Sequence, residues 1–279
     1  MKEFKNITLS IPEELFELTF ATLMDFSTLG IREDYDKLII TFESTNWNDE
    51  VKNELLDAIK SFYPDVEILN EELILAQNWN EEWERNVPII QISDKVAITP
   101  KWKKHEIDVE LPIIINPKMS FGTGQHETTR LICKLMEEYV VPDELWVDAG
   151  TGTGVLAILA AKLGAKKVFA FDNNSWAVEN TSENIILNSV ESIITVTESD
   201  IDDYIFPTCN GIVANLYANL ILSSLDKFYN SLKENNGKLL VSGILVYDEA
   251  EIIQKTLSLG FRLIKETQEA EWVALAFQS

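Results

Sequence analysis

The sequence predicts an α/β chain in two parts: a small N-terminal α/β domain and a larger, doubly wound domain with a mainly parallel sheet. Three observations predict this fold. Strand-like and helix-like segments alternate from Leu145 onward, which is typical of a parallel sheet covered on both faces. A glycine-rich turn at 150–154 links the first of these strands to a helix. The first roughly 70 residues have an alternation of their own.

Seven strand-like runs make up the predicted sheet of the larger domain. The first five alternate with helical segments and lie at 145–147, 168–171, 193–196, 212–214 and 238–241. The last two, 261–265 and 272–277, are separated by about six residues, whereas a parallel crossover needs about a dozen or more. They should therefore pair as an antiparallel hairpin at the sheet edge. The fold class is a seven-stranded Rossmann-like sheet with an antiparallel last strand, an ending unusual for a dehydrogenase.

The N-terminal segment predicts a ferredoxin-like domain. Strand-like runs at 5–11, 37–42 and 65–69 alternate with helical periods at 13–25 and 51–62, close to the order β-α-β-β-α-β, although only one middle strand is clear. The segment has no glycine-rich loop, histidine or cysteine, so we expect it to bind the substrate rather than to perform chemistry. The predicted organisation is 1–72 for substrate recognition, 73–95 for a connector and 96–279 for the catalytic domain.

The charge balance limits the possible partners. The 279 residues include 46 acids and 23 bases, a formal net charge of −23, which disfavours DNA and RNA and favours a basic protein. The alternative interpretation is that the excess of acidic residues serves only to keep the protein soluble. No apolar run is long enough to cross a bilayer and no signal core is present, so we expect a cytoplasmic monomer without membrane partners. The two cysteines and two histidines do not cluster, so no metal site is expected.

The glycine-rich turn and the acid before it indicate the cofactor. Gly150 and Gly152 belong to a G-x-G-x-G pattern rather than the G-x-G-x-x-G of dinucleotide sites. Asp148, two residues before the first glycine, would repel a pyrophosphate but attract the ammonium and sulfonium of S-adenosylmethionine. Asp172, 24 residues further on, ends the next strand, where a carboxylate can accept both ribose hydroxyls. Asp200 follows the third strand and can reach the adenine edge.

Further motifs make the sequence resemble the ribosomal protein L-eleven methyltransferase family (PrmA) over essentially its whole length. The family pattern F-G-T-G-x-H-x-T-T stands at 121–129. Trp79 and Trp83, four residues apart in the connector, together with Pro100-Lys101-Trp102, fit the family's connector. We read the two tryptophans as anchors on one helix face, with base stacking as the alternative. The segment at 213–218 resembles the family's A-N-I-L-A pattern.

The resemblance implies specific site residues. Carried over by position, Thr129, Gly150, Asp172 and Asn215 should contact S-adenosylmethionine, and Phe121 with the glycine loop at 122–124 should cover it near the methyl group. The N-terminal domain of the family recognises a basic protein of the large ribosomal subunit. The sequence departs from the family at three places: Asn173-Asn174-Ser175 after Asp172, the missing glycine near Lys118, and Tyr217 in place of a small aliphatic residue.

Asn215 is the predicted catalytic residue. It follows the fourth strand, and its amide oxygen can accept a hydrogen bond from an amine and aim the lone pair at the methyl group. Capping of the strand–helix turn is the alternative reading. His126 is a tempting general base, but a loop histidine is more often a structural hydrogen-bonding residue. Thr128 and Thr129 begin a helix and can serve either as its cap or as cofactor contacts.

The sequence therefore predicts an S-adenosylmethionine-dependent protein N-methyltransferase. Its expected substrates are Lys ε-amino groups, and an N-terminal α-amino group, of a large-subunit ribosomal protein. Three alternatives stay open: a methyltransferase of the same fold that acts on another protein, RNA or a small molecule, a nicotinamide-dependent oxidoreductase, and a non-catalytic assembly factor.

Overall fold

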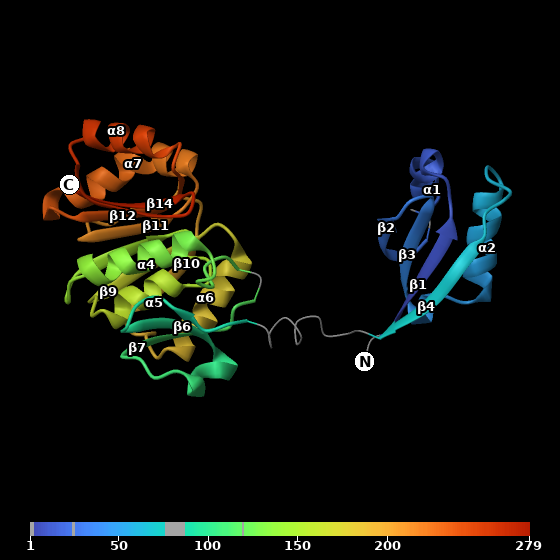
Figure 1. The fold of residues 1–279 in the computed structure, drawn as a ribbon, viewed down its shortest axis with the longest axis horizontal. Helices are drawn as coiled ribbons and strands as arrows, with labels where there is room; N and C mark the ends of the chain where they lie inside the picture. The colour runs from blue at the N-terminus through green and yellow to red at the C-terminus, as the bar shows by residue number, and fades with distance from the viewer. Residues whose placement is uncertain (1–2, 24–25, 76–86, 119) are drawn as a thin grey trace. The chain divides into compact units, whose positions relative to one another are not determined.

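The computed structural model describes residues 3–23, 26–75, 87–118 and 120–279, and the chain divides into two compact units, Met1–Asn86 and Val87–Ser279 (Figure 1). The predicted connector tryptophans, Trp79 and Trp83, lie outside the described residues. No helix in the described ranges is long and apolar enough to span a membrane.

The described residues of the N-terminal unit form a four-stranded antiparallel sheet in the order β2-β3-β1-β4 with two α-helices. Its elements are β1 (Glu3–Ser10), η1 (Glu13–Leu15), α1 (Phe16–Leu23), β2 (Thr28–Glu33), β3 (Lys37–Glu43), η2 (Ser44–Asn46), α2 (Asp49–Lys60) and β4 (Ile68–Leu75). Apolar residues of β1, β3 and α2 form its core, among them Ile7, Phe42 and Leu55. A polar cap starts α2, where the Asn48 side chain accepts from the backbone N–H of Val51 at 3.0 Å.

Two features of this unit were not clear in the sequence. The second middle strand, β2, is mostly exposed and contains Gly30, so it lacks the apolar alternation that would have marked it. The last strand, β4, continues to Leu75, because Leu75 pairs with Glu3 of β1. The N-terminal domain therefore extends beyond residue 72, its predicted end.

The second unit is built on the seven-stranded sheet that the sequence predicts. Its strand order is β10-β9-β8-β11-β12-β14-β13, and β14 runs antiparallel to both of its neighbours. The strands are β8 (Leu145–Ala149), β9 (Lys167–Asp172), β10 (Ile194–Glu198), β11 (Gly211–Asn215), β12 (Lys238–Leu245), β13 (Arg262–Glu269) and β14 (Trp272–Gln278). The prediction of a Rossmann-like sheet closed by an antiparallel hairpin is confirmed.

Helices cover both faces of this sheet, because alternate residues of each strand point to opposite sides. On β8, Trp146 packs into one buried cluster and Val147 into the other. Figure 1 shows α7 and α8 above strands β11, β12 and β14, and α4 and α5 below them. The helices are α4 (Glu127–Tyr139), α5 (Val155–Lys162), α6 (Ser175–Leu187), α7 (Ala218–Leu232) and α8 (Glu249–Ser258), with a 3-10 turn, η4 (Lys233–Asn235), after α7.

A third, small sheet also belongs to the second unit. It consists of β5 (Ile90–Gln91), β6 (Val96–Pro100) and β7 (Leu111–Ile115), with η3 (Lys101–Glu106) between the last two. The predicted connector at 73–95 includes β5, but β5 pairs with β6 and belongs to the second unit. Two buried asparagines, Asn184 in α6 and Asn188 at its C-cap, fix the end of β7. Asn188 bonds both backbone groups of Ile114, and Asn184 accepts from the N–H of Asn116 at 2.7 Å.

Candidate active site

A cavity of about 540 Å³ lies where β8, β9, β10 and β11 end. This is the edge at which doubly wound folds bind ligands, and the volume falls within the ~300–1,000 Å³ of small-molecule sites. Its lining residues are Phe121, His126, Thr128, Gly150, Gly152, Phe171, Asp172, Asn173, Ser199, Asp200, Ile201, Asn215, Leu216, Tyr217, Leu220, Gly243 and Trp272. Phe121, Gly150, Gly152, Asp172 and Asn215 were all predicted from the sequence.

The glycine turn after β8 forms one wall of the cavity. The backbone N–H groups of Gly150 and Thr151 both donate to the carbonyl of Phe171 at 3.0 Å, which ties the turn to the end of β9. Gly150, Gly152 and Gly154 all have positive φ, a conformation that side-chain-bearing residues rarely adopt. The sequence therefore needs glycine at these positions to bring backbone close to a ligand.

A second glycine loop, residues 121–124, docks directly on the first. The Thr153 N–H donates to the Phe121 carbonyl at 2.9 Å, and the Thr153 hydroxyl donates to the Gly122 carbonyl at 2.8 Å. A Cβ at Gly152 would lie 2.4 Å from the Phe121 carbonyl oxygen, so only glycine allows this contact. The docking fixes Phe121 at the cavity rim, where 55% of the residue is exposed.

Two aspartates give the cavity an acidic side. Asp172 accepts from the Gly152 N–H through Oδ2 and from the Asn174 N–H through Oδ1, each at 3.0 Å. A carboxylate can accept about four hydrogen bonds, so two places remain for the hydroxyls of a ligand. Asp200 also lines the cavity, whereas no Lys or Arg does so among the described residues. This cavity suits a cationic ligand better than a pyrophosphate.

Asp148 does not line the cavity but lies buried behind the glycine turn. Its Oδ2 accepts from the Thr151 hydroxyl at 2.7 Å and from the N–H of Ala157 in the first turn of α5 at 3.0 Å. Gly154, the N-cap of α5, has no side chain, so Asp148 supplies the missing cap. Burial raises the pKa of this carboxyl to about 7.

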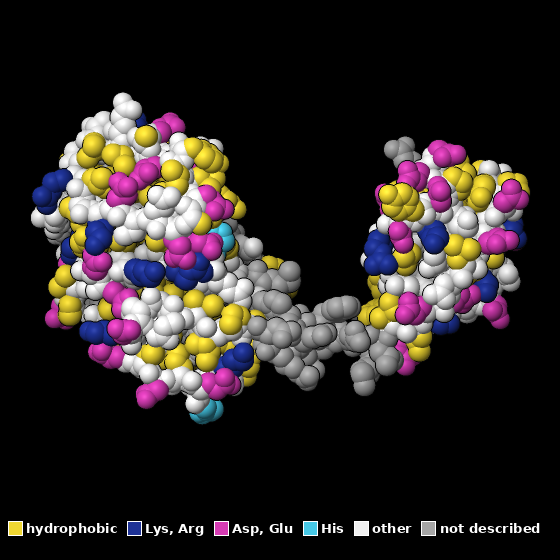
Figure 2. Space-filling model, viewed as in Figure 1, with side chains coloured by type: hydrophobic (Ala, Val, Ile, Leu, Met, Phe, Trp, Pro, Cys, Tyr) yellow, Lys and Arg dark blue, Asp and Glu magenta, His cyan; other side chains and the backbone are white. Residues whose placement is uncertain are grey.

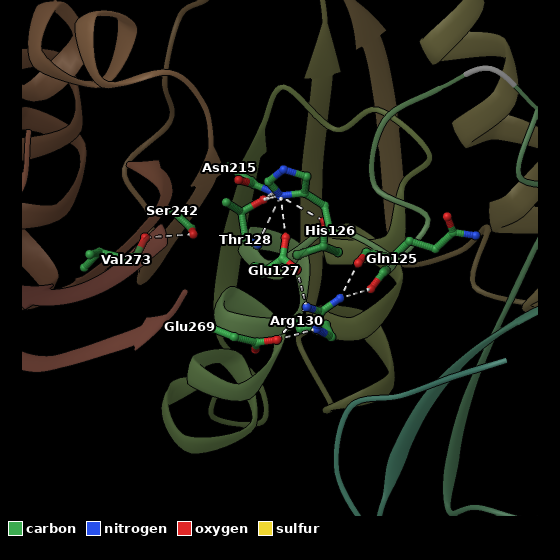
Figure 3. A network of polar contacts seen from close by, with 11 residues as sticks. Gln125, His126, Glu127, Thr128, Arg130, Asn215, Ser242, Glu269 and Val273 are labelled. Carbon is green, nitrogen blue, oxygen red and sulfur yellow. Dashed lines mark hydrogen bonds and ion pairs between the residues drawn. The ribbon is translucent and has the colours of Figure 1, made fainter. Parts of the chain in front are cut away.

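A chain of three polar side chains sets the orientation of Asn215. Its Nδ2 donates to the Thr128 hydroxyl at 3.2 Å and lies 3.5 Å from the Thr129 hydroxyl, as Figure 3 shows for Asn215, Thr128 and His126. With the amide nitrogen used in this way, the amide oxygen is left to accept a bond in the cavity. Thr129 itself is buried and does not line the cavity.

His126 has a structural contact that accounts for its ring. Its Nδ1 accepts from the Thr128 N–H at 3.3 Å as the N-cap of α4 and lies 2.9 Å from the Thr128 hydroxyl. These bonds assign the ring proton to Nε2. The ring therefore stabilises the start of α4 and has no free acceptor nitrogen. This agrees with the interpretation of His126 as a structural hydrogen-bonding residue.

Three rings form a row along the cavity. The His126 ring centre lies 5.4 Å from that of Phe121 and 4.8 Å from that of Trp272, the latter in an edge-to-face arrangement. Trp272 was not predicted from the sequence, because nothing but its place at the start of a strand distinguished it. Gly243 was not predicted either, although an isolated glycine within a strand indicates a bulge or a close backbone approach. A Cβ at Gly243 would lie 2.3 Å from the Leu216 carbonyl oxygen.

Comparison with known proteins identifies the family of this fold and site. The family model for "Ribosomal protein L11 methyltransferase (PrmA)" matches residues 5–279. The chain belongs to this family. The ribosomal protein L11 methyltransferase of Chlorobaculum tepidum is 34% identical over 273 residues, which cover 96% of this chain and 94% of that one. The corresponding protein of Staphylococcus carnosus is 32% identical, with 99% of this chain and 88% of that one covered.

A solved structure of similar sequence supports the PrmA assignment. The crystal structure of a ribosomal protein L11 methylase from Lactobacillus delbrueckii subsp. bulgaricus has a TM-score of 0.63 and 29% identity to this chain. The match covers 68% of this chain and 97% of that one.

The PrmA chain is an S-adenosylmethionine-dependent methyltransferase, and its cavity fits that cofactor. The remaining acceptor places of Asp172 suit a ribose diol, and the absence of Lys and Arg from the described lining suits a sulfonium. Gly150 in the glycine turn packs closely against the Leu216 side chain, which a Cβ at this position would meet at 2.5 Å.

Replacement of Gly152 should separate cofactor binding from general stability. In Gly152→Ala the new Cβ meets the Phe121 carbonyl and φ is +57°, so the loop at 121–124 must move away. We expect the free energy of unfolding to fall by at least ~1–2 kcal/mol, the strain of a left-handed residue, and S-adenosylmethionine to bind at least about ten-fold more weakly. Thermal denaturation and calorimetric titration measure both.

Gly164→Ala is the matched control, because Gly164 also has positive φ, +100°, but contacts Pro142 outside the cavity. It should lower stability while leaving cofactor affinity unchanged. Equal losses of cofactor affinity in the two variants would contradict the role given to the docked loops.

The buried Asp148 should make stability depend on pH. Its folded pKa, about 7, lies above the ordinary 3.8, so the folded chain binds more protons between these values. The contribution of this carboxyl to the free energy of unfolding therefore falls as pH rises from about 4 to about 7, by up to ~4 kcal/mol at about 1.4 kcal/mol per unit. Denaturant titrations of the native chain and Asp148→Asn at pH 5 and pH 8 measure it.

The Asp148→Asn variant should lose this part of the pH dependence, whereas replacement of the exposed Asp203 by Asn should keep it. Parallel stability curves for the native chain and Asp148→Asn would show that the ionised form of Asp148 is not disfavoured by burial.

Proposed function

We propose that this chain transfers methyl groups from S-adenosylmethionine to Lys ε-amino groups, and to an N-terminal α-amino group, of a basic large-subunit ribosomal protein in the cytoplasm. The observation that carries the proposal is the orientation of Asn215, a cavity-lining residue whose amide nitrogen is held by threonine hydroxyls while its oxygen has no hydrogen-bond partner among the described residues. The relatives named for ribosomal protein L11 support the substrate class.

The substrate amine must reach the cavity uncharged. S-adenosylmethionine supplies an electrophilic methyl group when it is bound. A free lysine has a pKa of about 10.4, so only about one in a thousand is neutral near pH 7.5. Apolar rings at Phe121, Trp272 and Phe171 line the cavity and disfavour the ammonium form by desolvation.

Asn215 orients the neutral amine. Its oxygen accepts one amine N–H, which turns the nitrogen lone pair toward the site of the methyl group. An amide is too weak a base to take the proton, and the bonds of His126 to Thr128 leave that ring no free acceptor. The displaced proton therefore leaves to water.

We propose that the N-terminal unit is a ferredoxin-like substrate-recognition domain that extends to the end of β4, that a connector joins it to a methyltransferase domain that includes β5 and continues to residue 279, and that the chain acts as a monomer. The unit's four-stranded antiparallel sheet with two helices supports this proposal. Acidic side chains lie on the viewed surface of both units in Figure 2, which is complementary to a basic ribosomal protein and unfavourable to RNA.

The first test is transfer of labelled methyl groups to free ribosomal proteins and to purified large subunits. One labelled basic protein is the expected result. Asp172→Asn should weaken cofactor binding by about ten-fold or more, since hydrogen bonds to a charged acceptor contribute ~1.5–3 kcal/mol. Asn215→Ala should instead lower kcat by roughly a hundred-fold, because it removes the group that aligns the amine. It should leave the hydrogen bonds to the cofactor hydroxyls intact.

Labelled RNA, or label in no protein while the cofactor binds, would contradict the substrate class. Equal effects of Asp172→Asn and Asn215→Ala on cofactor affinity would contradict the separate roles of these two residues.

A second test concerns the N-terminal unit. Residues 87–279 contain both buried clusters of the seven-stranded sheet, so this fragment should bind the cofactor like the full chain. Its kcat/KM for the intact ribosomal protein should fall by about a hundred-fold or more as the second binding surface is lost. A short lysine peptide serves as the control, because both proteins should methylate it equally. Unchanged turnover on the intact protein would show that the N-terminal unit does not recognise the substrate.

A further inference from the structure

The Arg130 side chain, in the first turns of α4, joins three separate parts of the second unit (Figure 3). Its Nη2 lies 2.8 Å from Glu127 of its own helix, and its Nε and Nη2 lie 3.0 and 2.5 Å from Oε1 of Glu269 in β13. Its Nη1 donates to the carbonyl of Gln125 and lies 3.5 Å from that of Gly124. All three guanidinium nitrogens are therefore bonded, and the side chain is 20% exposed.

This network connects the two chain segments that carry the three cavity rings, Phe121, His126 and Trp272. Gly124 and Gln125 belong to the segment that holds Phe121 and His126. Glu269 ends β13 and pairs directly with Trp272, across the tight turn that begins β14. Arg130 itself does not line the cavity. It thus links the wall that carries Phe121 and His126 to the wall that carries Trp272, although these walls are far apart in the sequence.

We propose that Arg130, paired with Glu269, is a positioning residue that sets the spacing of the Phe121, His126 and Trp272 rings and so the alignment of the substrate amine. A planar guanidinium suits this task, because it can bond a carboxylate and two carbonyls at fixed angles, which a lysine cannot do. The cofactor contacts of Asp172 and the glycine turn lie on other elements, so loss of Arg130 should affect alignment more than cofactor binding.

The fold supplies a matched control. Lys265 of β13 pairs with Glu138 of α4 at 3.2 Å, so this ion pair joins the same two elements away from the cavity. Lys265→Gln should therefore remove an α4–β13 ion pair without disturbing the ring row.

The test compares Arg130→Lys, Glu269→Gln and Lys265→Gln with the native chain. Arg130→Lys and Glu269→Gln should lower kcat on the ribosomal protein by roughly ten- to a hundred-fold, as expected for an alignment error of about 1 Å, with S-adenosylmethionine affinity changed less than about two-fold. Lys265→Gln should leave both unchanged.

Nuclear magnetic resonance gives a readout that needs no substrate. The chain has two histidines, His105 and His126, so their ring resonances can be assigned with a single His105→Gln variant. The His126 signals should carry ring-current shifts from Phe121 and Trp272, and these shifts should change in Arg130→Lys and Glu269→Gln but not in Lys265→Gln. The His105 signals should stay constant in all three.

Two outcomes would overturn the proposal. One is an unchanged His126 spectrum in Arg130→Lys and Glu269→Gln. The other is a loss of kcat matched by equal losses of cofactor affinity and thermal stability, which would indicate a structural role alone. The inference rests on methyl transfer at this cavity, but the two can fail separately. A wrong substrate would abolish turnover in every variant and leave the resonance shifts as predicted.

Discussion

The Phe121 carbonyl oxygen occupies the place where a side chain at residue 152 would begin, and much of the site depends on that contact. Because Gly152 has no Cβ, the loop at 121–124 can accept two hydrogen bonds from Thr153 and cover the glycine turn. The same turn is held from below by Phe171 and Asp172. The two loops therefore fix one another, and the walls that they contribute to the cavity are set before any ligand binds.

Buried polar side chains of α6 maintain this arrangement. On α6, Thr181 bonds the Gly152 carbonyl, Asn184 bonds the Thr153 carbonyl and Asn180 bonds the Asn116 carbonyl. These side chains share one face of the helix and satisfy carbonyls that loops would otherwise bury without partners. Asp148 has the complementary role at the N-terminus of α5, where it accepts from the Ala157 N–H. The cost is a carboxyl whose ionised form is disfavoured by burial and whose Oδ1 has no partner among the described residues.

The sequence predicted the sheet and most of the cavity because both follow local rules. Alternating strands and helices specify the doubly wound order, a short last connection specifies the hairpin, and side chains just after parallel strands meet at one edge. Asp148 shows the limit of that reasoning: its position fits a cofactor contact, but the backbone turns between it and the cavity. Trp272 and Arg130 could not be found in the same way, since their importance comes from contacts across about 140 residues of sequence.

The charge of the site has to satisfy opposing demands. An acidic cavity attracts a cationic cofactor and a basic protein, but carboxylates close to the amine would also stabilise its ammonium form, which cannot accept a methyl group. The structure separates the two effects. Asp172 and Asp200 lie after β9 and β10, whereas the amide of Asn215 follows β11 beside the rings of His126 and Trp272. In the proposed function, a neutral acceptor at this position orients the amine without raising its pKa, so an amide suits the end of that strand better than a third carboxylate.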